Sequence, residues 1–321
     1  MFGFLRRILD RDHVSLSPPP DLVTIERDKV AHLWHRPEGL PRLDWLMAAA
    51  WVQRNAPRNV NHAPWLRAVL AACLDDLRDD LSVDHRRWRS RHIEGIAPLD
   101  GSTSASIAST AERSCKILAE SLRIIRGDIP VAPVAIVAIT PLDAYIDFTS
   151  AYFPDQGEFA TSGGLYLNEG TGSIPIIAIN AATPTAAPQT VAHELTHHAL
   201  HGLRVPLWIE EGFTQMMEER VTGVCHFTLD REMAERQRDH WSEHDLDSYI
   251  EGDAFHSPEG DTQELAYHLS QWVVRGELTR RGNDFLSFVR ACQQGDPDHH
   301  CRRMLGSSQR ELIATVLGIP A

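Results

Sequence analysis

One helical segment in the second half of the chain constrains the fold more strictly than any other feature. Pro188 suits the first turn of a helix, and Gly202 suits the left-handed residue that ends one. Between them, Val191, Leu195 and Ala199 recur every four residues and form an apolar stripe. The sequence therefore predicts a helix over residues 188–201 that packs along one side and can carry polar groups on the other.

Two histidines four residues apart, with a glutamate directly after the first, lie in the middle of this helix. Residues with this spacing lie about one turn above each other, so His193 and His197 can bind one metal ion. Glu194 then reaches a water on that ion and can act as a general base. His198 points about 100° away from His197, and His201 lies about 12 Å beyond His193 along the axis. The pattern predicts one catalytic zinc ion that these two additional histidines do not bind.

A third protein ligand is needed, because a catalytic zinc ion commonly has three and leaves one position for water. Glu210 and Glu211 lie on the next predicted helix, which a turn at Gly202 would bring back alongside the first. Glu211 is followed at helical spacing by Gln215 and Glu218, a polar stripe that could hydrogen-bond the metal ligands. Glu210 is followed by apolar residues instead. The residues alone leave both glutamates as candidates.

The histidine motif, followed by Trp208-Ile209-Glu210-Glu211-Gly212-Phe213, resembles the gluzincin zinc metallopeptidases. Its spacing is closest to compact bacterial peptidase MA-like domains, which are distantly similar to thermolysin-like enzymes and alanyl aminopeptidases. The resemblance implies that Glu211 is the third zinc ligand and that Glu194 is the general base in peptide-bond hydrolysis. It also implies that Tyr267 donates a hydrogen bond to the oxyanion. The alternative for Tyr267 is a helix-packing side chain.

The substrate class follows from a departure from the aminopeptidase pattern. Aminopeptidases of this superfamily bind the free amine through a Gly-x-Met-Glu-Asn segment, which Gly163–Glu169 matches only loosely. We therefore expect an endopeptidase, with this strand as an edge to which an extended peptide adds. The rival function is a zinc-stabilised scaffold or protein-interaction module without activity. Glu194 argues against the scaffold, because structural zinc has no use for a general base.

The expected fold class is α+β, with a zincin-like metallopeptidase core of a small sheet and active-site helices, preceded by a mainly helical N-terminal region. Apolar runs predict strands in the second half, and apolar positions at helical spacing predict helices in the first. The expected strands are residues 131–139, 163–167 and 174–179, and the expected N-terminal helices are 43–53, 64–81 and 107–126. The predicted organisation is a tail or linker over 1–20, the helical region over 21–128 and the metallopeptidase domain over 129–321.

The charge distribution bears on partners. Residues 1–130 hold 19 Lys and Arg against 17 Asp and Glu, whereas the remaining residues hold 12 against 27. The acidic half carries the histidine motif, which favours peptide or protein substrates of basic character and disfavours nucleic acid. The helical N-terminal region is a candidate site for a protein partner. We expect no membrane span, because no apolar run approaches about 18 residues.

Five scattered cysteines without a Cys-x-x-Cys pair suit a reducing compartment, and the first residues lack a secretory signal. These features predict a cytoplasmic protein. The segment 292–301 combines cysteines, histidines and aspartates of types that suit zinc. Its spacing matches no common zinc finger, so we expect a loop between helices there.

Overall fold

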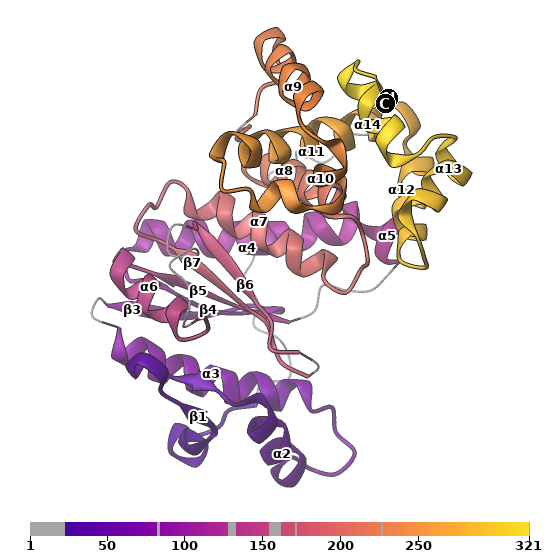
Figure 1. The fold of residues 1–321 in the computed structure, drawn as a ribbon. Helices are drawn as coiled ribbons and strands as arrows, with labels where there is room; N and C mark the ends of the chain where they lie inside the picture. The colour runs from indigo at the N-terminus through magenta and orange to yellow at the C-terminus, as the bar shows by residue number, and fades with distance from the viewer. Residues whose placement is uncertain are drawn as a thin grey trace.

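The computed structural model describes residues 23–81, 84–127, 133–153, 162–170, 172–225 and 227–320, so the expected tail over 1–20 lies outside the described residues. The fold is α+β, as predicted, and helices make up most of it (Figure 1). Beside the main sheet there is a separate two-stranded sheet of β1 (Trp34–His35) and β2 (Arg42–Leu43). Short 3-10 helices are η1 (Arg27–Lys29), η2 (Ala31–Leu33), η3 (Pro37–Gly39) and η5 (Asp253–His256).

The main sheet has five strands in the order β3-β4-β5-β7-β6. The central strands β4, β5 and β7 run parallel, and the two edge strands pair antiparallel to their neighbours. Every residue of β4 and β5 is buried, as expected for strands covered on both faces. The strands are β3 (His85–Arg89), β4 (Ile93–Pro98), β5 (Val134–Ile139), β6 (Gly164–Leu167) and β7 (Ile176–Asn180).

Three strands of this sheet were predicted, and two were not. The expected strands over 131–139, 163–167 and 174–179 correspond to β5, β6 and β7. β3 and β4 lie in the region that the sequence predicts as mainly helical, and they belong to the same sheet. β3 carries three arginines in five residues, so it lacks the apolar signature of a strand. The sheet therefore joins the two regions that we separated at residue 128.

Helices cover both faces of the sheet. Alternate residues of β5 point in opposite directions: Ile136 and Ala138 belong to the core beneath one helical layer, and Val137 and Ile139 to the core beneath the other. The first layer consists of α4 (Gly101–Ser121) and α7 (Ala187–Leu200), with α5 (Arg123–Arg126) beyond α4. The opposite side carries α2 (Trp45–Asn55), α3 (Ala63–Asp80) and α6 (Leu142–Ser150) (Figure 1).

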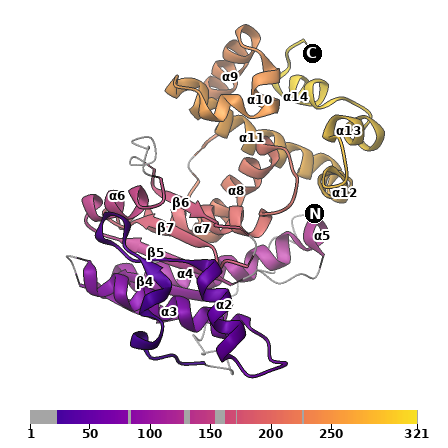
Figure 2. The same ribbon diagram turned by 60° about the horizontal axis from the view of Figure 1, so that its bottom comes forward.

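A helical lobe follows the sheet and contributes to the same core as α4 and α7 (Figure 2). Its first helix, α8, packs against both α7 and α11. Gly212 permits this close packing, because a Cβ there would lie 2.5 Å from the Ser270 carbonyl oxygen on α11. The lobe consists of α8 (Leu207–Thr222), α9 (Arg231–Glu243), α10 (Leu246–Glu251), α11 (Gly260–Arg281), α12 (Asn283–Cys292), α13 (Pro297–Leu305) and α14 (Gln309–Leu317).

The expected loop over 292–301 is wrong for its second half. Helix α13 begins at Pro297, and the Asp296 side chain caps it by accepting a hydrogen bond from the Asp298 N–H. Aspartate before proline is a standard start for a helix, and it outweighs the absence of a long apolar run. Cys301 is therefore a buried helix residue rather than part of a loop.

Candidate metal centre

The site is built on α7 and α8, two helices joined by a tight turn and packed side by side. Pro188 lies in the first turn of α7, as predicted. Gly202 has φ +80°, the left-handed conformation that the sequence predicts there. The return of the chain at this glycine brings the start of α8 alongside the histidine-bearing turns of α7, which is the arrangement that a shared site requires.

Three side chains from these helices converge. The Nε2 atoms of His193 and His197 lie 3.2 Å apart, and carboxylate oxygens of Glu211 lie 3.9 Å and 3.5 Å from them. Ligands about 2.0–2.1 Å from a tetrahedral ion would lie roughly 3.3 Å from one another, so the observed separations fit. Among the described residues, these three are the one group of histidine, cysteine or carboxylate donors close enough to hold a metal ion.

Electrostatics also favour a cation between these side chains. Glu211 is only 5% exposed, and its Oε2 has no hydrogen-bond partner in the described part of the chain. Burial raises the pKa of Glu211 above its usual value, although the two histidines oppose the shift. A buried carboxylate oxygen without a partner is costly, and a metal ion would remove that cost. The chemistry of the donors therefore fits a divalent ion such as zinc.

Carboxylates hold the outer nitrogens of both histidines. Glu218 Oε1 lies 3.3 Å from His193 Nδ1, and Glu210 Oε1 lies 2.9 Å from His197 Nδ1. Such contacts orient each ring so that its Nε2 faces the centre. Burial lowers the pKa of His193, but the Glu218 hydrogen bond and the neighbouring carboxylates outweigh burial and raise it to about 9. In His197, burial lowers the pKa, but the Glu210 hydrogen bond together with the charges of Glu211 and Glu194 outweighs it, and the pKa is raised.

The sequence predicted the supporting role of Glu218 but not that of Glu210. Glu218 lies in the polar stripe expected to support the ligands, and it does contact His193. Glu210 was a competing candidate for the third ligand; the structure places it against the outer face of His197 instead. Neighbouring positions on a helix point about 100° apart, so Glu210 and Glu211 could not both face the same atom. The angle shows that their roles must differ, and the packing of α8 against α7 decides which glutamate faces the two Nε2 atoms.

Glu194 follows His193 on α7 and lies next to the edge of the sheet. It is 8% exposed, and the described residues supply no hydrogen-bond or ion-pair partner for its carboxylate. Edge strand β6 passes directly beside it, because a Cβ on Gly164 would lie 3.1 Å from Glu194 Cγ. The carboxylate therefore lies between the metal-binding helix and the edge of the sheet, close enough to His193 and His197 for its charge to help raise their pKa values.

Tyr267 lies on α11 and faces the same carboxylates. Its ring packs edge-on against Phe255, with 5.2 Å between the ring centroids. Burial raises the pKa of Tyr267, and the charges of Glu211 and Glu194 raise it further, so the phenol stays protonated at neutral pH. The position suits a hydrogen-bond donor to the site, but the ring packing also satisfies the alternative structural role.

His198 of α7 and its C-cap residue His201 contact the edge-strand region, and neither belongs to the metal-donor group. His198 Nδ1 lies 3.1 Å from the Tyr166 hydroxyl, and His201 Nε2 lies 2.7 Å from the Asn168 amide nitrogen. Both partners belong to β6 or follow it directly. These contacts attach the end of α7 to the sheet edge and leave the metal centre to the two predicted histidines.

In the described residues, no helix combines the length and apolar character that crossing a membrane requires.

Comparison with known proteins leaves the sequence-based family assignment a prediction. No protein-family model matches this chain, and no curated protein is similar to it.

Proposed function

We propose that this protein is a zinc-dependent endopeptidase in which His193, His197 and Glu211 bind the ion and Glu194 is the general base. The observation that carries this proposal is a group of three metal donors in the described residues, with the charge of Glu194 acting on both histidines and no hydrogen bond to its carboxylate there. Two imidazoles and one carboxylate, with a fourth position left for water, form a common ligand set for catalytic zinc. A purely structural zinc usually has four protein ligands and needs no base.

The chemistry divides between the ion and the side chains. Zinc, when bound, polarises the peptide carbonyl and lowers the pKa of water at its open position to about 7. Glu194 accepts the proton of the attacking water and then passes it to the leaving amine. Glu218 and Glu210 keep the two imidazoles in their binding orientation throughout. Tyr267 donates a hydrogen bond to the oxyanion that forms on the carbonyl oxygen.

The edge strand supplies a place for the substrate backbone. β6 pairs with β7 on one side, and within the described residues no further strand pairs with its other side. An extended peptide can therefore add to β6 by main-chain hydrogen bonds, which would hold it beside Glu194. This binding mode requires no free terminus, so it favours internal peptide bonds. The acidic half of the chain favours basic peptides among them.

The direct test is Glu194→Gln, assayed on a mixed peptide library with the metal content measured. We expect hydrolysis to fall about 10²–10⁴-fold while zinc stays bound, because proton transfer is lost and the ligands are retained. Glu243→Gln, which changes an exposed glutamate without an ion pair at the end of α9, is the matched control. Full activity of the Glu194 variant would disprove the mechanism. No cleavage by zinc-loaded wild-type protein would favour the scaffold instead.

Tyr267→Phe separates the two roles of this residue. If the hydroxyl stabilises the oxyanion, kcat should fall about 10²–10³-fold with little change in KM, because the hydrogen bond forms only in the transition state. The phenyl ring keeps the contact with Phe255, so the melting temperature should change little. Unchanged kcat would assign Tyr267 to helix packing.

A further inference from the structure

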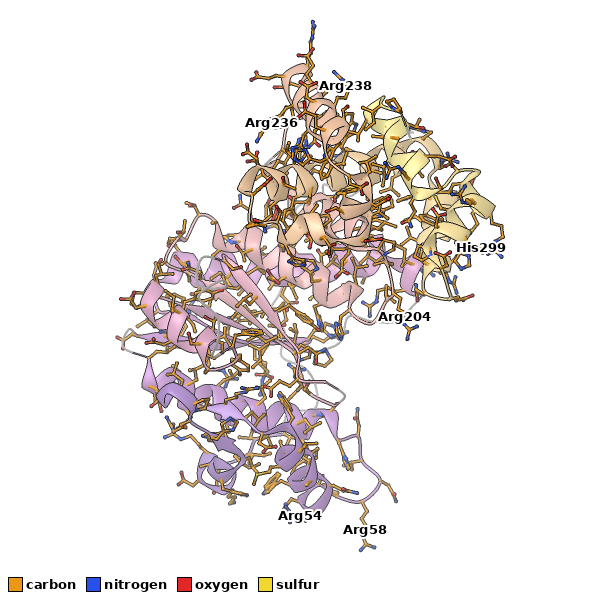
Figure 3. The ribbon with its side chains drawn as sticks, viewed as in Figure 1. Arg54, Arg58, Arg204, Arg236, Arg238 and His299 are labelled. Carbon is orange, nitrogen blue, oxygen red and sulfur yellow. The ribbon has the colours of Figure 1, made fainter. Side chains whose placement is uncertain are left out.

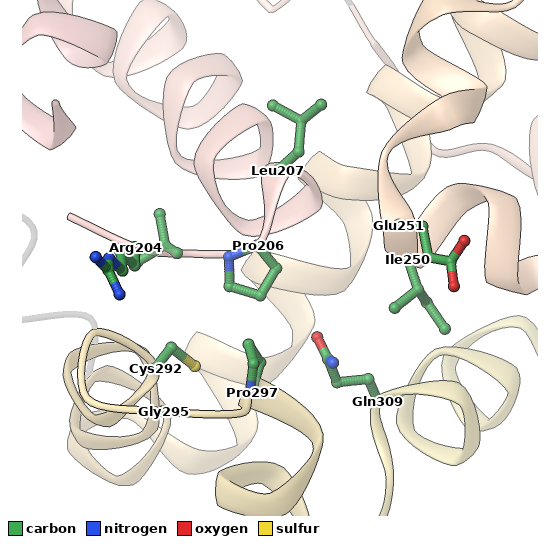
Figure 4. A pocket seen from close by; sticks show the side chains of 10 residues that line it. Arg204, Pro206, Leu207, Ile250, Glu251, Cys292, Gly295, Pro297 and Gln309 are labelled. Carbon is green, nitrogen blue, oxygen red and sulfur yellow. The ribbon is translucent and has the colours of Figure 1, made fainter. Parts of the chain in front are cut away.

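A cavity separate from the metal ligands lies in the helical lobe, at the start of α8. Its volume is about 470 Å³, within the range of pockets that hold small molecules. Figure 4 shows it between the beginning of α8, the end of α10 and the segment from α12 to α14. None of the metal-centre residues lines it. Val205, Leu207, Ile250 and Pro297 give it apolar walls.

Three helices begin at this cavity. Leu207, Pro297 and Gln309 all line it, and they are the first residues of α8, α13 and α14. The starts of α13 and α14 are capped by Asp296 and Ser308, but α8 has no side-chain cap. The first two N–H groups of α8 therefore lack an acceptor among the described residues. Uncapped N–H groups at a helix start attract anions.

Side-chain donors lie on the same side. Gln309 is 6% exposed, and its Oε1 accepts a hydrogen bond from Trp208 Nε1 at 3.0 Å. Its Nε2 finds no acceptor among the described residues, and the amide faces the cavity (Figure 4). Arg204, exposed at the rim, has no carboxylate partner in the described chain (Figure 3). The unpaired side-chain groups named on this side are donors, which matches a carboxylate ligand.

The other side of the cavity has the opposite character. Glu251, the last residue of α10, is exposed at the rim, and no cation of the described chain pairs with it. Figure 4 shows Glu251 and Arg204 on opposite sides. Cys292 lies on the Arg204 side of the cavity (Figure 4), and burial raises the pKa of its thiol to about 12, so it adds no negative charge. Among the lining residues, the Glu251 carboxylate would attract an ammonium group.

We propose that this cavity binds a small zwitterion with an apolar body, namely a free amino acid or a short peptide with both termini unblocked. The carboxylate would lie at the α8 start, near Gln309 and Arg204, and the ammonium group at Glu251. The apolar walls would contact the side chains. This site is separate from the metal centre, and the proposal does not depend on peptidase activity.

The test is calorimetric titration of the chain with leucyl-leucine after chelator treatment, which prevents hydrolysis during the measurement. We expect binding of the free dipeptide and at least tenfold weaker binding of leucyl-leucine amide, which lacks the carboxylate that several donors contact. N-acetyl-leucyl-leucine, which lacks only the ammonium group beside Glu251, should bind about two- to fivefold more weakly. Free leucine, titrated in parallel, tells whether one residue suffices. No binding at millimolar concentration, or equal binding of the free and blocked peptides, would overturn the proposal.

Substitutions of the lining residues test whether leucyl-leucine binds in this cavity. Gln309→Glu keeps an acceptor for Trp208 but replaces the free donor by an anionic oxygen, so the affinity for leucyl-leucine should fall at least tenfold. Arg204→Gln and Glu251→Gln should each weaken binding about two- to fivefold, as for exposed ion pairs. Arg58→Gln, at the opposite end of the molecule in Figure 3, and Glu243→Gln are the matched controls. If Gln309→Glu lowers the melting temperature, its effect on affinity is not specific, and Arg204→Gln and Glu251→Gln become the test of the site. Unchanged affinity in both of these variants would show that the ligand binds elsewhere.

Discussion

Two buried carboxylates, Glu94 on β4 and Glu211 on α8, are nearly equally hidden from solvent but differ in their surroundings. Glu94 is 1% exposed and accepts hydrogen bonds from Arg67, Arg87 and Arg89 at 2.8–3.2 Å. Glu211 is 5% exposed, faces two imidazoles, and has one oxygen without a hydrogen bond. Glu94 is thus fully paired within the described chain, whereas Glu211 is not.

The different surroundings of Glu94 and Glu211 distinguish a charge cluster that stabilises the fold from one that can bind a metal ion. Fixed guanidinium groups satisfy Glu94 in every state of the protein and tie α3 to the first two strands of the sheet. Imidazoles can be neutral, and neutral imidazole is the form that binds metal. The unsatisfied oxygen of Glu211 is therefore better explained by an ion that the site accepts than by its protein neighbours. Matched substitutions at the two glutamates test this contrast.

Glu94→Gln should have the largest effect on stability. The amide cannot accept from all three arginines, and it leaves buried positive charge without compensation, which costs about 3–5 kcal/mol. Urea unfolding should show this loss relative to Glu243→Gln, and metal affinity should not change. A loss below about 1 kcal/mol, the range of an exposed ion pair, would mean that the cluster is far more hydrated than its burial indicates.

Sequence predicted the local parts of this fold better than the long-range ones. α7 was predicted because Pro188, Gly202 and the apolar stripe all act within one helix. β3 was missed because its arginines pair with a carboxylate on β4 and not with anything a sequence pattern reveals. A strand held by tertiary ion pairs carries no periodic apolar signal.

The metal centre shows the same difference between local features, which the sequence predicts, and long-range contacts, which it does not. The spacing of the two histidines predicted their shared ligand position, because one turn of helix fixes it. Contacts between α7 and α8 depend on the relative rotation of two helices, which no spacing defines. The polar stripe suggested Glu218 in advance, but the partner role of Glu210 became visible only once the helices were packed. The cavity at the three helix starts also required the structure, because its walls come from segments about 100 residues apart.

The second prediction concerns the glutamates behind the histidines and has an intermediate effect. Glu218→Gln and Glu210→Gln should each lower zinc affinity about 10–100-fold, or about 1.4–2.7 kcal/mol, since the imidazole loses its charged acceptor. Competition with a chromophoric chelator measures the affinity directly. Glu243→Gln, which changes an exposed glutamate at the end of α9, is the matched control, because Glu243 contacts neither histidine. Unchanged affinity in both variants would show that helix packing alone orients the rings.

The smallest effect on stability is expected for Glu211→Gln, and it tests the contrast with Glu94 most directly. In the metal-free protein, Glu211→Gln should change the free energy of unfolding by less than about 1 kcal/mol, because the lost attraction to His193 and His197 is offset by removing a desolvated charge with an orphan oxygen. Urea unfolding of chelator-treated protein measures it beside Glu94→Gln. With zinc added, wild-type protein should gain stability and the Glu211 variant should gain much less. If Glu211→Gln lowers the free energy of unfolding of the metal-free protein as much as Glu94→Gln does, the contrast between the two glutamates is wrong. The imidazoles would then already satisfy Glu211, and no ion would be needed to explain its burial.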